Sequence, residues 1–270
     1  MKLGLMAHPG VPDRVRVAEE VARHVEGKAD LVVTDELSQV FPKLPAQPLD
    51  AMDVDLLITV GGDGAILLAL QRCAAPVFGV NMGELGFLTE VDPPHLRGAL
   101  DRLLAGDFRV EERGKVAVRV NGKRVPDAAN EAAVKAAHPS KLLALRVACD
   151  GAVVDHLRAD GVIVATPTGT TSYSLSAGGP IVDPRVQAML LVPLAAFKLS
   201  ARPHVFPSTS NLEVALPDAA KDAVVVIDGQ FEHALAGGDK LTFTGSEHKA
   251  RFVRLFGHNF YDTLRSRLVR

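Results

Sequence analysis

GGDG at residues 61–64 is the stretch around which this chain of 270 residues is organised. It follows the apolar run DLLITV at 55–60 and precedes the apolar run AILLALQR at 65–72. The first run is typical of a buried strand, and the second is typical of a helix. Proteins of the α/β class hold phosphate groups on a glycine-rich turn between a strand and a helix, because glycine admits unusual backbone angles and close approach of a ligand. The stretch therefore predicts a phosphate-binding turn in an α/β domain.

Asp63 is the unusual member of this turn, because a carboxylate repels phosphate groups. Two interpretations are open. In the structural one, Asp63 caps the N-terminus of the helix that follows. In the functional one, it accepts a proton from a hydroxyl nucleophile or positions a metal ion. The sequence contains neither the Walker A pattern nor the G-x-G-x-x-G dinucleotide pattern, so the two commonest nucleotide-binding motifs are excluded.

Composition and charge narrow the class of protein. Hydrophobic residues make up 47% of the chain, enough for a large core, and the net charge of −2 gives no electrostatic reason to expect nucleic acid or an anionic membrane as a partner. The apolar run at 3–7 is too short for a signal peptide, and the longest one, near 188–197, is interrupted by Pro193. Cys73 and Cys149 suggest neither a metal cluster nor a disulfide framework. We therefore expect a cytoplasmic protein.

The order of the predicted elements divides the chain near residue 106. Before it, strand and helix patterns alternate, which predicts a parallel sheet covered by helices. After it, short strand patterns dominate, and Asn121-Gly122 and Asp150-Gly151 are typical of type I′ hairpin turns. We expect an α/β domain over 1–106 and a mostly β domain, a sandwich or compact barrel, over 107–256. The expected strands lie at 3–7, 30–34, 55–60, 76–81, 116–120, 143–149, 162–165, 212–216, 223–228, 240–244 and 251–256, and the expected helices lie at 65–72, at 93–106, at 259–269 and from Pro12 onward.

A second polar constellation, TPTGTTSYSLSAGGP at 166–180, follows the predicted strand at 162–165. It is crowded with hydroxyls and glycines in an otherwise aliphatic protein, and such a surface suits a ribose, an amide or a base. The alternative is a Ser/Thr-rich connector that caps a short helix. The pair Asn130-Glu131 and the triplet at 228–230, DGQ, are each explained by a simple turn when taken alone.

At this point the sequence resembles the NAD kinase family nearly from end to end. The resemblance is carried by GGDG at 61–64, NMGELGFLTE at 81–90, NE at 130–131 and DGVIVATPTGTTSYSLSAGGPIVDP at 160–184. It implies an N-terminal Rossmann-like nucleotide-binding domain, a C-terminal β-sandwich-like domain, and a C-terminal helix, 257–270, that returns to the first domain. It also implies transfer of the ATP γ-phosphoryl group to the 2′-hydroxyl of the adenosine ribose of NAD, giving NADP. The implied cofactor is a divalent metal ion, Mg or Mn, whose protein ligands the sequence does not identify.

The resemblance also assigns roles to individual residues. Asp63 is implied to be the base or orienting group for the 2′-hydroxyl. The phosphate turn is implied to be shaped by Gly61, Gly62 and Gly64. The residues implied to bind NAD are Asp63, Gly64, Phe87, Asn130, Glu131, Arg158, Asp160, Thr171, Ser172, Tyr173 and Ser176. In this family the segment around Tyr173 can act across a subunit interface, so a homodimer or homotetramer is implied.

Two departures from the family pattern stand out: Ala65 occupies a position where Thr is frequent, and no His follows Pro193. Two other functions compete with NAD phosphorylation. One is a different GGDG-type kinase that acts on a sugar or a lipid, and the long 160–184 segment argues against it. The other is a noncatalytic dinucleotide-binding sensor, for which Asp63 would only add repulsion near phosphates. The sequence does not distinguish NAD from NADH as the acceptor.

Overall fold

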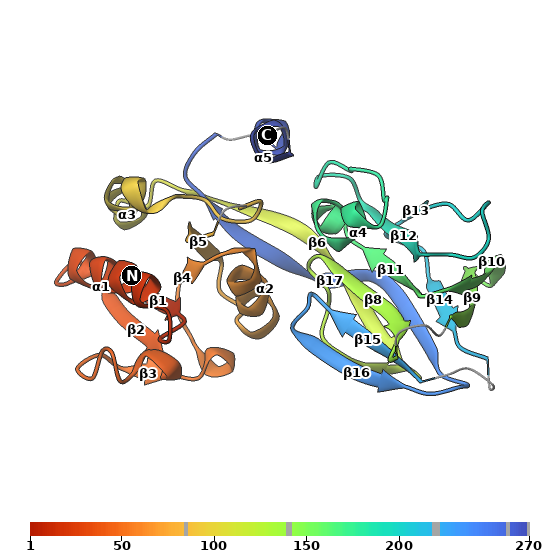
Figure 1. Ribbon diagram of the computed structural model, residues 1–270. Coiled ribbons are helices and arrows are strands. Elements are labelled where there is room, and N and C mark those ends of the chain that lie inside the picture. The colour runs from red at the N-terminus through yellow and green to blue at the C-terminus, as the bar shows by residue number, and fades with distance from the viewer. Residues whose placement is uncertain (84–85, 139–141, 218–221, 258–259, 269–270) are drawn as a thin grey trace. The chain divides into compact units, whose positions relative to one another are not determined.

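The computed structural model describes residues 1–270 except 84–85, 139–141, 218–221, 258–259 and 269–270, and it divides into two units (Figure 1). Unit 1 comprises residues 1–112 and 250–270, and unit 2 comprises residues 113–249. The expected boundaries were 106/107 and 256/257. The observed ones fall inside two long strands, β6 (Arg109–Val120) and β17 (Lys240–Arg254), through which the chain leaves and re-enters unit 1.

Unit 1 is built on a parallel sheet of strand order β5-β4-β1-β2-β3, which confirms the predicted α/β class. Strand β4, which lies between β5 and β1, is buried at every residue, as expected for a strand covered on both faces. The end of β17 adds a further parallel pairing to β5, through Phe252 and Val77. The strands are β1 (Lys2–Ala7), β2 (Asp30–Thr34), β3 (Ala46–Gln47), β4 (Leu56–Gly61) and β5 (Val77–Asn81).

The helices of unit 1 follow the apolar spacing of the sequence. Helix α1 (Pro12–Val25) has proline in its first turn, where no hydrogen-bonding N–H is needed, and it buries Val17, Ala18, Val21 and Val25. Helix α2 (Asp63–Arg72) follows the GGDG turn. The helix expected at 93–106 is a 3₁₀ turn, Pro93–His95, followed by α3 (Leu96–Leu104).

The C-terminal helix α5 (Phe260–Leu268) belongs to unit 1. The first and last residues of the helix expected at 259–269 lie outside the described residues, as do residues 84–85 of the motif at 81–90. None of the helices in the described ranges combines the length and apolarity that a membrane span requires.

Unit 2 holds two antiparallel arrangements of strands around one apolar core, which confirms the mostly β class. One is a six-stranded sheet of order β13-β12-β11-β8-β15-β16, and the other runs β10-β9-β14-β17 with β6 and β7 beside it. The strands are β7 (Lys123–Arg124), β8 (Glu131–Ala136), β9 (Leu143–Cys149), β10 (Ala152–Ala159), β11 (Gly161–Ala165), β12 (Ala188–Leu194), β13 (His204–Pro207), β14 (Leu212–Ala215), β15 (Ala223–Ile227) and β16 (Phe231–Leu235).

Local turn chemistry in unit 2 matches the sequence, whereas strand lengths do not. Asn121-Gly122 and Asp150-Gly151 have positive φ at both residues, as a type I′ hairpin turn requires. The two strands expected at 240–244 and 251–256 are one continuous strand, β17. Position 245 lies inside this strand and requires glycine, because a Cβ there would approach the carbonyl oxygen of Ser208 to 2.7 Å.

Candidate functional site

The GGDG turn joins the end of β4 to the start of α2 in unit 1. Gly62 is the N-cap residue, with φ −98° and ψ −167°, and Asp63 is the first helical residue. None of these three glycines has a positive φ, so the expectation of unusual backbone angles is wrong here. Gly61 is required for another reason: a Cβ would lie 2.7 Å from the Cβ of Ala65. Because Gly62 has no side chain to cap the helix, the first N–H groups of α2 suit a phosphate group.

The side chain of Asp63 does not cap its own helix, so the structural interpretation of this residue is corrected. Its Oδ2 accepts a hydrogen bond from the backbone N–H of Phe87 at 3.0 Å, and its Oδ1 accepts one from Leu88 at 3.1 Å. The carboxylate is thus held against the 86–88 segment of the chain. A carboxylate has about four lone-pair sites, so these two bonds alone do not use its full acceptor capacity.

In unit 2, the polar centre is Asp228, which sequence reasoning explained only as part of a hairpin turn. Asp228 and Gly229 do form such a turn, with φ values of +50° and +66°. The Asp228 side chain is buried, however, and it accepts hydrogen bonds from the N–H groups of Ala129 at 2.8 Å, Asn130 at 2.7 Å and Glu131 at 3.0 Å. Asp228 therefore fixes the backbone of the Asn130-Glu131 pair. The available signal was an acidic residue directly after the apolar run AVVVI.

Glu131 begins β8 rather than forming a turn after a strand, and its side chain is buried. Burial and the nearby charge of Asp228 raise the pKa of Glu131 to about 8, although the Ser172 hydroxyl donates to its Oε1 at 3.3 Å. The Oε2 of Glu131 and the Oδ1 of Asn130 have no hydrogen-bond partner among the described residues. Buried polar atoms are nearly always paired, so these two atoms suit a ligand.

The 166–180 segment folds as a 3₁₀ turn, Thr168–Thr171, followed by the short helix α4 (Tyr173–Ser176). It packs directly on the Asn130 backbone: a Cβ at Gly169 would lie 2.1 Å from the carbonyl oxygen of Asn130. The hydroxyl of Thr171 donates to the Thr168 carbonyl, so it serves the turn itself. Tyr173 and Ser176 are exposed, and Ser172 reaches Glu131. The structure therefore brings Asn130, Glu131 and Ser172 together.

Arg158 and Asp160 lie elsewhere in unit 2. Asp160 precedes β11, whereas the 166–180 segment follows it, and β11 pairs with β8 so that Glu131 lies opposite Ala165. Five strand residues at about 3.4 Å each separate the two ends by roughly 17 Å. Arg158 instead places its guanidinium over the Phe197 ring, 5.5 Å from its centroid. In a single copy of unit 2, Arg158 and Asp160 therefore lie away from the Asn130-Glu131 pair that was predicted to share their ligand.

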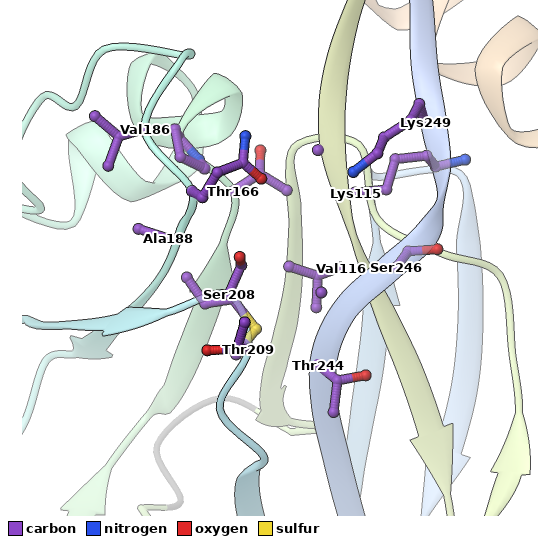
Figure 2. Close-up of a pocket in the computed structure, with 15 residues that line it drawn as sticks. Lys115, Val116, Thr166, Val186, Ala188, Ser208, Thr209, Thr244, Ser246 and Lys249 are labelled. Carbon is purple, nitrogen blue, oxygen red and sulfur yellow. The ribbon is translucent and has the colours of Figure 1, made fainter.

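A pocket of about 270 Å³ lies in unit 2 (Figure 2). Among its lining residues, two are lysines and none is acidic, and Ser208, Thr209 and Thr244 are among those that carry a hydroxyl group. Burial lowers the pKa of Lys115, while the charges of Asp127 and Asp228 act in the opposite direction. Of the 166–180 segment, Thr166 and Pro167 are the residues that line this pocket. Its lining is Gly114, Lys115, Val116, Thr166, Pro167, Val186, Gln187, Ala188, Met189, Ser208, Thr209, Thr244, Gly245, Ser246 and Lys249.

The raised pKa of Glu131 leads to a prediction about stability against pH. The unfolded carboxyl ionises from about pH 4.5, whereas the folded one stays protonated up to about pH 8. The folded state is therefore favoured fully below pH 4.5, loses stability between pH 4.5 and 8, and changes no further above that range. Glu131→Gln resembles the protonated form, so its melting temperature relative to wild type should rise across this window.

The measurement is thermal unfolding of both proteins at pH 4.5, 6 and 8.5. Glu112→Gln, a change at an exposed glutamate, is the matched control and should show no such trend. A Glu131→Gln variant whose difference from wild type is the same at all three pH values would contradict the assignment of a protonated Glu131.

Comparison with known proteins covers both units. The family models described as the ATP-NAD kinase N-terminal and C-terminal domains match residues 10–108 and 129–255. A protein named NAD kinase from Methanothermobacter thermautotrophicus is 44% identical, with 100% of this chain and 96% of that protein covered. The NAD kinase of Thermococcus kodakarensis is 39% identical, with 97% and 96% covered.

Two solved structures are similar to the whole chain. The crystal structure of an NAD kinase from Archaeoglobus fulgidus in complex with ATP has a TM-score of 0.82 and 29% identity, and covers 100% of this chain and 99% of that one. The yeast NADH kinase complexed with NADH has a TM-score of 0.92, with 100% and 87% covered. Its identity is 23%, so this likeness concerns the fold alone.

Proposed function

The chain belongs to the ATP-NAD kinase family, and from that premise we propose that it transfers the γ-phosphoryl group of ATP to the 2′-hydroxyl of the adenosine ribose of NAD, which yields NADP. The observation that carries the proposal is the Asp63 carboxylate, held by two backbone N–H groups beside a phosphate turn. A pure binding protein has no use for a fixed negative charge at that place. A phosphoryl transferase does, because its alcohol nucleophile must lose a proton.

Asp63 is the proposed catalytic residue. The 2′-oxygen of the ribose forms a bond to the γ-phosphorus, the bond from that phosphorus to the β,γ-bridging oxygen breaks, and ADP leaves. The hydroxyl proton passes to a carboxylate oxygen of Asp63, whose direction is set by the N–H groups of Phe87 and Leu88. The backbone at Gly61, Gly62 and Gly64 and the N-terminus of α2 support the phosphate groups of ATP.

A divalent metal ion, Mg or Mn, is part of the proposal. Within the described ranges, no three His, Cys, Asp or Glu side chains are arranged to hold a metal ion. Mg²⁺ commonly binds through nucleotide phosphates and one or two carboxylates rather than in a cage of protein ligands. When bound, the metal ion neutralises charge on the phosphate oxygens.

The proposed NAD site uses the residues that converge in unit 2. The unpartnered Oδ1 of Asn130 and Oε2 of Glu131 face no protein donor among the described residues, and a protonated Glu131 can both donate and accept. These groups suit the hydroxyls and amide of a dinucleotide. Tyr173 adds an exposed aromatic face, 44% accessible, for stacking. Thr171, Ser172 and Ser176 complete the proposed set in unit 2, while Phe87 and Gly64 of unit 1 are assigned to NAD by the family resemblance alone.

The test of the proposed function is incubation with ATP, magnesium and NAD, followed by an assay specific for NADP. A parallel incubation with NADH asks which acceptor is preferred. A kinase for a sugar or lipid would consume ATP only with those acceptors, and a sensor would bind NAD without forming product. Either result would overturn the proposal.

Tyr173→Ala is expected to raise KM for NAD while KM for ATP stays nearly unchanged, since stacking of an aromatic ring contributes about 0.5–1.5 kcal/mol beyond area burial. Steady-state kinetics with each substrate varied in turn measures this. Tyr261→Ala, at a ring in α5 that is 56% exposed, serves as the control for loss of an exposed aromatic side chain. Equal losses for both substrates would place Tyr173 away from NAD.

A homodimer or homotetramer is the proposed assembly. Phe197 and Leu199, in the connection between β12 and β13, are 71% and 92% exposed, and two apolar side chains this close in the chain suit contact with a second copy. Arg158 and Asp160 lie at the opposite end of β11 from Tyr173, so they are available to the site of a second copy. Light scattering during the assay checks this: an active monomer would contradict it.

A cytoplasmic location is also proposed, in keeping with two cysteines that form no disulfide.

A further inference from the structure

Arg254, the last residue of β17, is the centre of a buried ionic cluster in unit 1 and lies outside every motif of the sequence analysis. Its Nη1 donates to Glu90 Oε2 at 3.0 Å and to the carbonyl oxygen of Leu88 at 3.1 Å. Its Nε donates to Glu111 Oε2 at 2.8 Å. The guanidinium also lies over the Phe252 ring, 5.0 Å from its centroid. Only 9% of the Arg254 side chain and 4% of the Glu90 side chain are exposed.

Leu88 connects this cluster to the GGDG turn. Its carbonyl oxygen accepts from Arg254, while its N–H donates to Asp63 Oδ1 at 3.1 Å. The neighbouring N–H of Phe87 donates to the other Asp63 oxygen. One short piece of backbone therefore lies between the guanidinium and the carboxylate, and its position sets the direction of both hydrogen bonds to Asp63.

Glu90, two residues after Leu88, holds the same segment through its own side chain. Its Oε1 accepts from the N–H groups of Leu255 at 2.8 Å and Phe256 at 2.9 Å, and its Oε2 accepts from Arg254. Residues 88–90 are thus tied to residues 254–256 by both side-chain and backbone groups. Loops that carry function are otherwise the mobile part of a fold, and a loop held in this way keeps one conformation.

A buried ion pair is a poor device for stability alone. Removing two charges from water is costly, and apolar residues of similar volume often stabilise as much or more. What the guanidinium offers is five N–H donors in a rigid planar fork, which can reach two carboxylates and a carbonyl at once. Lysine has three donors at a single point and cannot reproduce that geometry.

We propose that Arg254 is a positioning residue for phosphoryl transfer: by holding Leu88 and Glu90, it sets the N–H groups that aim the Asp63 carboxylate. The inference rests on the proposed function, in which Asp63 accepts the proton of the 2′-hydroxyl. Arg254 acts through Asp63 and touches neither substrate in this account.

Arg254→Lys is the first variant, because it keeps the charge and changes the geometry. Misplacement of a catalytic group by about 1 Å costs up to ~10²-fold in rate, so kcat should fall between roughly 10- and 100-fold. KM for ATP should stay within about twofold, since the glycines of the phosphate turn are untouched. The control is Arg97→Lys, at an Arg–Glu pair on the surface of the same unit, with Arg97 77% exposed. It should leave kcat at the wild-type value.

A double-mutant cycle with Asp63→Asn separates positioning from general damage. If Arg254 acts only through the Asp63 carboxylate, Arg254→Lys should lower kcat in the wild-type background and have almost no effect on the residual kcat of Asp63→Asn. The same factor in both backgrounds would overturn the inference, as would an Arg254→Lys variant with wild-type kcat. Glu111→Gln, which removes one acceptor from the guanidinium at a side chain that is 23% exposed, is the second variant if Arg254→Lys does not fold.

A readout without catalysis completes the test. In nitrogen-15 NMR spectra, the amide signals of Phe87 and Leu88 report their bonds to Asp63. Arg254→Lys should shift both signals, and Arg97→Lys should shift neither. Unshifted amides would overturn the inference even in an active enzyme. If the wild-type protein forms no NADP, the proposed function fails, while shifted amides would still support Arg254 as the residue that aims Asp63.

Discussion

Asp63→Asn is expected to lower kcat for NADP formation by roughly 10²–10⁴-fold, the usual contribution of a general base. The substitution keeps the size of the side chain and removes its basicity. It also replaces one of the two acceptor oxygens by an NH₂ group, which faces the N–H of Phe87 or Leu88. We therefore expect a loss of stability of about 1–3 kcal/mol in addition. ATP binding should stay the same or tighten, because a negative charge near the phosphates is removed.

The measurement is steady-state kinetics combined with thermal unfolding. Asp92→Asn is the matched control, because the Asp92 carboxylate accepts from the Asn81 side chain at 2.9 Å near the other end of the 81–90 motif. That variant loosens the motif without removing the proposed base, so its kcat should stay close to wild type. If Asp63→Asn retains more than about a tenth of the wild-type kcat, or if both variants lose the same factor, Asp63 is a structural residue.

Asp228→Ala is expected to cause the largest loss of stability, about 3–5 kcal/mol. Three N–H groups, those of Ala129, Asn130 and Glu131, would lose their acceptor in the interior, and each buried unsatisfied group costs ~1–3 kcal/mol. Asp228→Asn should lie between Ala and wild type, since it keeps one acceptor oxygen. Because the same N–H groups fix the Asn130-Glu131 pair, KM for NAD should rise in both variants. Urea unfolding and steady-state kinetics measure the two effects.

Asp150 offers a matched control for Asp228. It occupies the same position of a type I′ turn, with a φ of +50°, and its carboxylate accepts from the N–H of Asn211 at 2.8 Å. Asp150 is exposed, so water replaces the lost acceptor and the loss of stability should be smaller. Equal losses for Asp150→Ala and Asp228→Ala would show that only the turn matters.

Patterns within a few residues were enough to predict much of the fold. The apolar spacing after Pro12 predicted α1, the run before GGDG predicted β4, and the Asn-Gly and Asp-Gly pairs predicted turns with positive φ. These patterns predict helices, strands and turns correctly because backbone preference and the period of apolar residues depend on neighbours within a few positions of the chain. They failed for β6 and β17, whose full lengths depend on the strands beside them, and for β8, where Glu131 was explained as part of a turn.

The long motifs at 81–90 and 160–184 also determined the family, and with it the reaction. What no local pattern could supply is the hydrogen-bond partner of three charged side chains, of which Asp228 and Arg254 are buried and Asp63 is half-buried. Asp63 meets Leu88 from 25 residues away, Asp228 meets Asn130 across 98 residues, and Arg254 meets Glu90 across 164. A buried charge must find hydrogen bonds wherever the folded chain places them, and that placement follows from the order of strands in the sheets. The sequence by itself therefore determined that Asp63 lies in a glycine-rich turn between a strand and a helix, and only the tertiary structure decided which groups hold its carboxylate in place.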